Sequence, residues 1–408
     1  MIGGGSKLAA MTRVPRPRRR LACSVVLAGL SALALLSGCA SAPSSGIVGD
    51  SPWQLLGTMP LSSFAFSDEV RGWGVDSSST GLMTSSDGGH DWGPATGRIV
   101  GAPAADGLPA TVDRLVQPLQ VVRADAAVFV AYDDRLPLGG SEVSMPRAAR
   151  SGILVSVDGG LTWRPCLSLA GPRDVVLFVA ATDASHLWAL CRSIPTSETA
   201  GPIDAPPFLL RTSDGGRHWV RLGTRQIGDP ALPGALGVPL VFVDSRHGWS
   251  LWDGSPAPFV RVTADGGRTW SPAAQVQNVG LGVCALDARH AWIATGTTRQ
   301  AVGGLFATSD GGRSWTRSAR FTKIPLAAVY FADEDDGWAV AAGSTGAAAM
   351  RGIYATSDGG RHWRRELTPA PSDQAWGRPG WQFCRAGTTL VVGCEGEMFS
   401  RPLPVSAL

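Results

Sequence analysis

An eight-residue pattern, Ser/Thr-x-Asp-Gly-Gly-x-x-Trp, occurs six times in this 408-residue sequence. Its copies span Ser85–Trp92, Ser156–Trp163, Thr212–Trp219, Thr263–Trp270, Thr308–Trp315 and Thr356–Trp363. Successive aspartates are 71, 56, 51, 45 and 48 residues apart. Four-stranded propeller blades repeat every roughly 40–50 residues. The pattern therefore predicts an all-β chain in which similar small sheets repeat around a ring.

Each residue type of this pattern suits a hairpin turn. Glycine permits the positive φ of a tight turn, and the Asp and Ser/Thr side chains accept hydrogen bonds from the turn's own N–H groups. The tryptophan offers a large apolar face to a neighbouring blade. We therefore interpret the repeated aspartates and tryptophans as structural. They are Asp87, Asp158, Asp214, Asp265, Asp310 and Asp358, and Trp92, Trp163, Trp219, Trp270, Trp315 and Trp363.

A second motif, Phe-x-Asp followed by Gly-Trp, stands upstream of several copies. It occurs at Phe66–Val75, Phe242–Trp249 and Phe331–Val340, with weaker forms at Ala181–Trp188 and Leu286–Trp292. The repeats resemble Asp-box (BNR) repeats, which are found in sialidases, sortilin-type receptors and xyloglucanases. The paired motifs, over about residues 53–404, resemble the photosystem II stability/assembly factor family of propellers. This resemblance implies a scaffold for a protein partner, although the fold hosts many functions.

The two ends of the repeat region indicate how the ring closes. A seventh unit lacks the box and offers three strands, at Trp381–Cys384, Thr389–Cys394 and Glu397–Pro402. The apolar run Trp53–Leu56 can supply its fourth strand, which leaves no free sheet edge. We predict one seven-bladed β-propeller domain over residues 51–408, with six blades as the alternative.

The N-terminal residues resemble an export signal. Five arginines between Arg13 and Arg20 precede the apolar stretch Leu21–Leu36, and Leu36-Ser37-Gly38-Cys39 matches a bacterial lipobox. We predict a signal peptide over residues 1–38, lipidation at Cys39 and a flexible tether over residues 39–50. The protein is then anchored to the outer face of the bacterial cytoplasmic membrane. The alternative is an ordinary secretory signal with a chance cysteine.

Charge argues against nucleic acid as a partner. Residues 1–38 contain six basic residues and no acidic one, so their removal changes the formal charge from +3 to −3. A mildly acidic chain without a basic stripe lacks the electrostatic signature of a nucleic-acid-binding protein.

The order of strands predicts two different faces. The turns between first and second strands and the boxes lie on one face, and variable loops lie on the other, where a rigid scaffold commonly carries binding. We therefore place the ligand opposite the boxes. Tyr132, Asp133, Asp134 and Arg135, at the start of the longest loop between second and third strands, are the candidate ligand-face residues, and a solvated turn is the alternative. The long loops are Arg98–Pro118, Asp133–Gly152, Arg192–Pro207, Thr224–Val238 and Thr295–Gly303.

Catalytic signatures are weak in this sequence. Resemblance to a sialidase would imply a pocket of three arginines with a Tyr/Glu nucleophile pair. Glu334, the acidic neighbour of Tyr330, instead belongs to a turn on the box face. Other glycosidases need two carboxylates at a fixed separation. Nothing in the sequence pairs the loop acids Asp133, Asp134, Glu142, Glu198, Asp204 and Asp253. We favour a non-catalytic protein-binding or assembly scaffold. The alternatives are a carbohydrate-active propeller (a hydrolase or a glycan binder) and a purely structural envelope protein.

We predict no cofactor and no metal site, since the six histidines are spread around the ring and no cysteine spacing resembles a zinc site. Disulfides are expected outside the cytoplasm. Cys384 and Cys394, on adjacent antiparallel strands, are the candidate pair, and Cys166 with Cys191 is a second pairing. Cys284 is expected to be a buried small hydrophobic residue.

Overall fold

The computed structural model describes sixteen stretches of the chain between Ser51 and Val405. They are residues 51–76, 81–101, 108–115, 118–133, 151–169, 174–193, 207–223, 240–252, 259–275, 280–297, 302–318, 321, 326–341, 351–368, 382–394 and 396–405. The predicted signal peptide, Cys39 and the tether lie outside these residues. Among the described residues, no helix has the length and hydrophobicity needed to cross a membrane.

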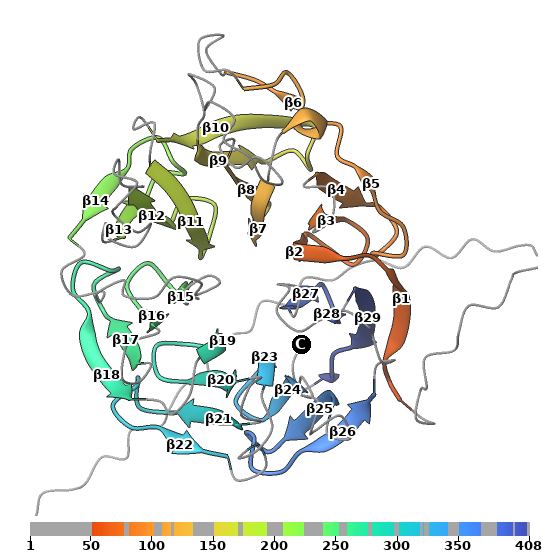
Figure 1. Ribbon diagram of the computed structural model, residues 1–408, viewed down its shortest axis with the longest axis vertical. Helices are drawn as coiled ribbons and strands as arrows, with labels where there is room; N and C mark the ends of the chain where they lie inside the picture. The colour runs from red at the N-terminus through yellow and green to blue at the C-terminus, as the bar shows by residue number, and fades with distance from the viewer. Residues whose placement is uncertain are drawn as a thin grey trace, which may run out of the picture. The chain divides into compact units, whose positions relative to one another are not determined.

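Seven antiparallel sheets stand around a common centre, so the described chain is a seven-bladed β-propeller (Figure 1). This confirms the predicted all-β fold and decides against six blades. In blades 1 and 3 to 6 the strands follow chain order from the centre of the ring outward, with the first strand innermost (Figure 1).

Blades 1 to 3 contain the first twelve strands of the repeat. Blade 1 is β2 (Leu61–Phe66), β3 (Gly72–Asp76), β4 (Leu82–Ser85) and β5 (Gly93–Pro94). Blade 2 is β7 (Pro118–Ala124), β8 (Ala127–Asp133), β9 (Ser151–Ser156) and β10 (Thr162–Ser168). Blade 3 is β11 (Asp174–Ala181), β12 (Leu187–Ser193), β13 (Phe208–Thr212) and β14 (Val220–Leu222).

Blades 4 to 6 repeat the same order. Blade 4 is β15 (Leu240–Phe242), β16 (Gly248–Trp252), β17 (Phe259–Thr263) and β18 (Ser271–Gln275). Blade 5 is β19 (Gly280–Ala285), β20 (Ala291–Thr297), β21 (Val302–Thr308) and β22 (Thr316–Arg317). Blade 6 is β23 (Leu326–Phe331), β24 (Asp336–Ala341), β25 (Gly352–Ser357) and β26 (Arg364–Leu367).

Blade 7 joins both ends of the described chain. Its strands β27 (Gln382–Ala386), β28 (Thr389–Cys394) and β29 (Glu397–Pro402) come from the C-terminal part, and β1 (Gln54–Thr58) pairs with β29. The register sets Gln54 opposite Ser400 and Thr58 opposite Glu397. The predicted N-terminal closing strand is confirmed.

Blade 2 carries an additional strand that the sequence did not reveal. β6 (Arg98–Ile99) runs parallel to β10 at the outer edge of this blade, and a short 3-10 turn, η2 (Val112–Arg114), follows it. From the sequence we predicted a long loop here, because a strand of two residues is too short to show an alternation of apolar and polar residues.

The six boxes are hairpin turns built by their own side chains. In each, the Ser/Thr hydroxyl donates to Asp Oδ1 over 2.8–2.9 Å and accepts the N–H of the second glycine over 2.9–3.1 Å. The Asp also accepts the N–H four residues later over 2.9–3.0 Å. Both glycines have φ between 71° and 96°, the left-handed region that side chains disfavour. The structural role predicted for these aspartates matches this geometry.

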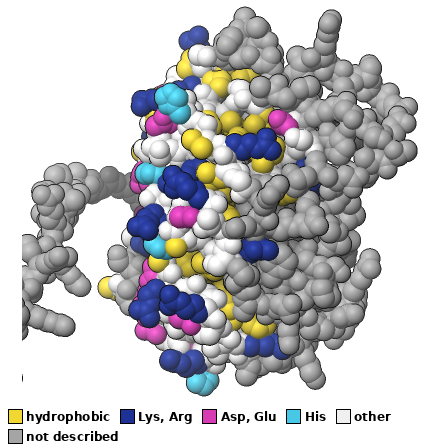
Figure 2. All heavy atoms as spheres, turned by 90° about the vertical axis from the view of Figure 1, so that its left-hand side faces the viewer, with side chains coloured by type: hydrophobic (Ala, Val, Ile, Leu, Met, Phe, Trp, Pro, Cys, Tyr) yellow, Lys and Arg dark blue, Asp and Glu magenta, His cyan; other side chains and the backbone are white. Residues whose placement is uncertain are grey.

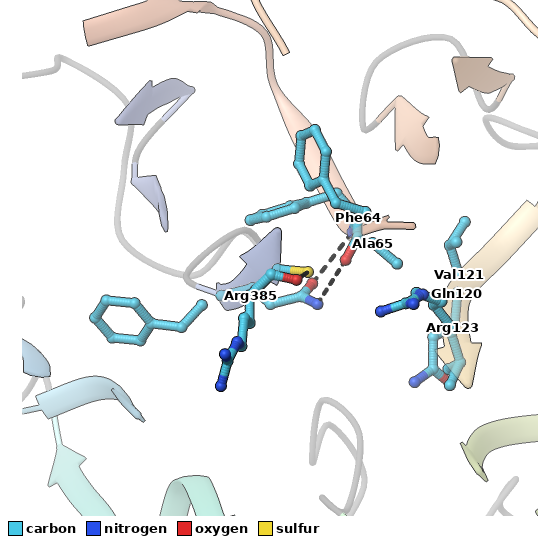
Figure 3. A pocket seen from close by; sticks show the side chains of 11 residues that line it. Phe64, Ala65, Gln120, Val121, Arg123 and Arg385 are labelled. Atoms are coloured by element: carbon cyan, nitrogen blue, oxygen red, sulfur yellow. Dashed lines mark hydrogen bonds between the residues drawn. The ribbon is translucent and has the colours of Figure 1, made fainter. Parts of the chain in front are cut away.

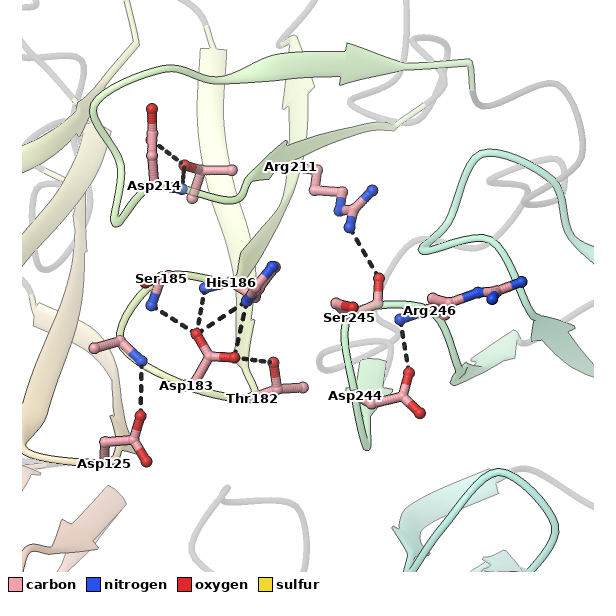
Figure 4. Close-up of polar contacts among 12 residues, drawn as sticks. Asp125, Thr182, Asp183, Ser185, His186, Arg211, Asp214, Asp244, Ser245 and Arg246 are labelled. Atoms are coloured by element: carbon pink, nitrogen blue, oxygen red, sulfur yellow. Dashed lines mark hydrogen bonds and ion pairs between the residues drawn. The ribbon is translucent and has the colours of Figure 1, made fainter.

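The Phe-x-Asp motif forms the turn between the first two strands of a blade, here called the A–B turn. In blade 3, Asp183 accepts the N–H groups of Ser185 and His186 over 2.7 and 2.8 Å (Figure 4). The carbonyl of Ser185 in turn accepts the N–H of Gly215 in the box of the same blade. The same contact joins the two motifs in blades 1, 4, 5 and 6, so the A–B turns and the boxes share one face of the ring.

The phenylalanine and glycine of the second motif are packed against each other. In blade 6 a Cβ added at Gly337 would lie 2.4 Å from the ring of Phe331, and Gly248 and Gly72 stand equally close to Phe242 and Phe66. Phe331 also stacks on Trp292 of blade 5, with ring centroids 3.8 Å apart and an interplanar angle of 8°. Each such phenylalanine is therefore held between its own blade's glycine and, in blades 4 and 6, the preceding blade's tryptophan.

We expect the boxes to make the fold sensitive to acid. Hydrogen bonds from the backbone N–H and the side chain of His218 hold the pKa of Asp214 below its ordinary 3.8, and those of His362 do the same for Asp358. A lowered folded pKa gives stability that is present above about pH 4 and is lost as the pH falls further. As the pH falls below about 4, the urea concentration at the unfolding midpoint should decrease. This decrease should be smaller in an Asp214→Asn/Asp358→Asn variant. Equal pH profiles for both proteins would contradict this.

Candidate functional site

The inner strands of blades 7, 1 and 2 line a shallow cavity of about 330 Å³ that is open to solvent (Figure 3). Its walls come from β27, β2 and β7, and none of the described residues that line it is Asp or Glu. A volume of this size matches the lower range of small-ligand pockets. The lining residues are Phe64, Ala65, Phe66, Gln120, Val121, Val122, Arg123, Gln382, Phe383, Cys384 and Arg385.

Two glutamines hold the strands of this cavity together. Gln382 of β27 accepts the N–H of Phe64 and donates to its carbonyl, over 3.2 and 2.8 Å (Figure 3). Gln120 of β7 makes the same pair of bonds with Val179 of β11, over 2.8 and 3.1 Å. Each amide thus acts as a bridge between the inner strands of adjacent blades, which fixes the cavity walls.

Two arginines give the cavity its charge. Arg123 and Arg385 are exposed, and each stands one residue before the end of its strand, beside an A–B turn. Arg385 donates through Nε to the carbonyl of Gly387 over 2.9 Å, which orients its guanidinium. Guanidinium groups stay charged at all working pH values and pair with carboxylates in a two-bond geometry. The cavity is therefore suited to a carboxylate or another anion.

The cavity opens near the face that carries the boxes, whereas the ligand was predicted to bind on the opposite face. Its two arginines lie next to A–B turns, hence toward the face that carries the boxes. On this face arginine, acidic and histidine side chains gather along the left-hand margin of Figure 2. The loops predicted to bind on the opposite face lie largely outside the described residues, so that prediction stays a prediction.

Sequence reasoning missed these arginines, although a signal exists. Blades 2 and 7 lack the Phe-x-Asp motif, and both carry Arg-Ala just before the A–B turn, at Arg123-Ala124 and Arg385-Ala386. The absence of the Phe-x-Asp motif from these two blades, with arginine just before the turn, could have pointed to the residues that line the cavity.

The candidates chosen from the sequence lie elsewhere. Tyr132 and Asp133 are not in an exposed loop but end β8, with 1% and 3% of their surface exposed, and Tyr132 packs in the core shared by blades 1 and 2. The expectation that these two side chains face a ligand is therefore wrong. Asp134 and Arg135 lie outside the described residues.

Tyr330 is a poor nucleophile in this structure. Burial raises the pKa of its phenol to about 12, and its ring lies 6.1 Å from that of Phe383. The hydroxyl is therefore protonated at neutral pH. Glu334 sits on the exposed A–B turn of blade 6, which agrees with its predicted place on the box face.

The predicted Cys384–Cys394 disulfide is wrong. Cys384 pairs across the strands with Val391, and its thiol is free. Cys394 stands three positions farther along β28, about 10 Å away at the usual rise per residue, beyond the reach of a disulfide. Cys166 and Cys191, the second pairing considered, are also free thiols.

These cysteines should be unreactive in the folded protein. Burial raises the pKa of Cys166 to about 12 and those of Cys284 and Cys384 to about 11. A thiol reagent at pH 8 should therefore leave these three unmodified until the protein unfolds. Thiol counting in denaturant without a reductant then tests the pairing, since a disulfide at Cys384 would hide two thiols.

Comparison with known proteins identifies the fold. No protein-family model matches the sequence, and no curated protein matches it. Among solved structures, YCF48 from Cyanidioschyzon merolae is 17% identical, with a TM-score of 0.54 over 86% of this chain and 98% of that one. YCF48 bound to D1 peptide is 14% identical, with a TM-score of 0.57 over 88% and 100%.

An enzyme shares the same architecture. The GH74 xyloglucanase from Xanthomonas campestris is 17% identical, with a TM-score of 0.54 over 86% of this chain and 53% of that chain. Identities this low establish a common fold and leave activity open. The chain thus has the β-propeller fold of these proteins, as its paired motifs predicted.

Proposed function

We propose that this protein is an exported, lipid-anchored propeller that binds a protein partner and serves as a non-catalytic assembly scaffold at the outer face of a bacterial cytoplasmic membrane. The observation that carries the proposal is the cavity between blades 7, 1 and 2. It presents Arg123 and Arg385, and the described residues that line it include no carboxylate. Such a surface suits an anionic group, and its described lining holds no Asp, Glu or His side chain to act as a general acid or base.

Two further observations support a binding role. The box aspartates are each engaged by hydrogen bonds within their own turn, so they serve the fold. A structure of similar fold contains YCF48 bound to D1 peptide, so a ring of this kind can hold a peptide. We propose that the partner here presents a carboxylate to the two arginines.

The lipid anchor rests on the sequence alone. The basic stretch, the apolar run and Cys39 supply the features that export and lipidation require.

The carbohydrate-active alternative needs two carboxylates at a fixed separation. Of the loop acids considered for it, Asp133 is buried at the end of β8. The others, Asp134, Glu142, Glu198, Asp204 and Asp253, lie outside the described residues.

A comparative pull-down from detergent-solubilised membranes tests the proposal. Wild type is compared with Arg123→Ala/Arg385→Ala and with a control of equal charge change, Arg217→Ala/Arg361→Ala, two exposed box arginines. We expect a specific protein to be retained by wild type and by the control and lost from the cavity variant. The same set of proteins on all three, or none on wild type, would overturn the proposal and direct the search to glycans.

A further inference from the structure

Two A–B turns of neighbouring blades bring a histidine and two carboxylates together. His290 and Asp287 belong to the turn of blade 5, and Glu334 belongs to the turn of blade 6. One donor atom from each of the three residues lies within 4.8 Å of the other two. Across the described residues, this is the one group of three or more His, Cys, Asp or Glu side chains with such spacing.

Two of the three donor separations are close to those that a small cation requires. His290 Nδ1 is 3.0 Å from Asp287 Oδ2 and 3.8 Å from Glu334 Oε1. In a tetrahedral zinc site with bonds of about 2.0–2.2 Å, the ligand atoms lie about 3.3–3.5 Å apart. The two measured separations bracket this value. The third, between the carboxylates of Asp287 and Glu334, lies within 4.8 Å, so an ion bound here would draw these two side chains together.

Asp287 is already oriented by the backbone. Its Oδ1 accepts the N–H groups of Arg289 and His290 over 2.7 and 2.8 Å, which directs Oδ2 to the imidazole. Hydrogen bonds of this kind fix a ligating carboxylate and raise metal affinity. His290 is 17% exposed, so its ring is held in place while remaining open to an ion.

The repeat supplies two natural controls. Blades 3 and 4 carry the same pair in the same turn, with His186 Nδ1 at 2.8 Å from Asp183 Oδ2 and His247 Nδ1 at 2.9 Å from Asp244 Oδ2. The residue that corresponds to Glu334 in the following turn is Ser245 or Ala288 (Figure 4 shows the turns of blades 3 and 4). These two turns therefore have two ligands where the turn of blade 5 has three.

The local charge also favours a cation. Every residue from Asp333 to Asp336 is acidic, and with Asp287 these residues outnumber Arg289, the one basic residue of the blade 5 turn, so the two turns together are negatively charged. The resulting potential raises the local concentration of cations. One imidazole with two carboxylates suits a divalent ion of the zinc type better than Mg²⁺ or Ca²⁺, which prefer oxygen ligands alone.

We infer that His290, Asp287 and Glu334 form a binding site for one Zn²⁺-type cation at the seam between blades 5 and 6, with water completing the coordination. The ion links the A–B turns of blades 5 and 6, which are also joined by the N–H of Phe331 donating to Cys284 Sγ over 3.2 Å. This site is separate from the cavity of the proposed function and does not depend on it.

Zinc titration of the untagged protein tests the site, because Zn²⁺ itself is the probe and no activity is needed. Relative to wild type, Glu334→Gln should bind Zn²⁺ at least about tenfold more weakly at this site, the effect usual for a lost metal-site interaction. Ala288→Glu places a third ligand beside His247 and should bind one more ion than wild type. Both substitutions are on turns, and circular dichroism melts confirm that the variants fold.

Three outcomes would overturn the inference. Wild type could bind no Zn²⁺, or Glu334→Gln could match wild type in both number and affinity of ions bound. If Ala288→Glu binds no additional ion, the glutamate of the following turn is not what makes the site. Ions held by other parts of the chain do not affect these comparisons, because each is a difference between single substitutions.

Discussion

Replacing Phe331 with alanine should lower the free energy of unfolding by about 3–5 kcal/mol, the cost of deleting a buried aromatic ring. Phe331 is 2% exposed, covers the backbone of Gly337 and stacks on Trp292 of the preceding blade. Its removal therefore opens a cavity inside blade 6 and at the seam with blade 5. Urea unfolding followed by tryptophan fluorescence measures the loss.

The repeat itself suggests how to test the cause. Blades 3 and 5 have alanine at the position of this phenylalanine. Ala181 of blade 3 stands opposite Leu187, and Ala285 of blade 5 stands opposite Ala291. Phenylalanine thus occurs with glycine, and alanine occurs with a residue that has a side chain. Gly337→Leu alone should destabilise by about 1–3 kcal/mol through overpacking against Phe331.

Combined with Phe331→Ala, however, Gly337→Leu should refill part of the cavity and restore part of the lost stability. The double-mutant cycle should give a coupling of about 0.5–3 kcal/mol in the favourable direction. Additive losses would show that the ring and the glycine do not depend on each other. Gly93→Ala, at a glycine with open space around it, serves as the control and should change little.

This pairing explains why the sequence predicted the fold so well. The box and the Phe-x-Asp motif are local, and each is satisfied within a few residues by its own glycines, hydroxyl and carboxylate. The hydrogen bonds of the box recur with nearly the same lengths in blades 1 to 6, so six copies of one pattern define six blades. The closing strand followed from a simple need, since three strands without a fourth leave an open edge.

The site depends on contacts between blades, which a repeat pattern does not display. His290 and Glu334 lie far apart in the sequence, and only the packing of adjacent A–B turns brings them to 3.8 Å. Tyr132 looked exposed because it precedes a long loop, yet every residue of β8 is buried between its neighbours. The Cys384–Cys394 pairing was wrong because Cys384 stands opposite Val391, three residues before Cys394. Strand boundaries predicted from sequence are not accurate enough to give this register.

A second large loss of stability should come from Glu366→Ala, at the point where the ring closes. Glu366 of β26 has 2% of its side chain exposed. It accepts a hydrogen bond from the indole Nε1 of Trp53 over 3.0 Å and forms an ion pair with Arg401 of β29. Arg401 also lies 4.8 Å above the ring of Trp338. One carboxylate therefore ties blade 6 to both chain ends that build blade 7.

We expect Glu366→Ala to cost about 3–5 kcal/mol, because it leaves the charge of Arg401, 13% exposed, without its buried partner. Arg364 provides the matched control. It forms an ion pair with the same carboxylate over 2.9 Å but is 78% exposed, so Arg364→Ala should cost at most about 1 kcal/mol. Urea unfolding of the two variants, followed by tryptophan fluorescence, measures both losses.

The difference between the two variants is the informative quantity. Glu366→Ala removes both ion pairs of the carboxylate and its hydrogen bond from Trp53, whereas Arg364→Ala removes only the exposed ion pair. Similar losses would show that burial at the closure does not govern the interaction. If Glu366→Ala is the costly one, limited proteolysis should also cut the N-terminal segment around Trp53 sooner than in wild type, because the indole has lost its acceptor. The stability of the closure then depends on a desolvated charge pair as well as on the β1–β29 hydrogen bonds.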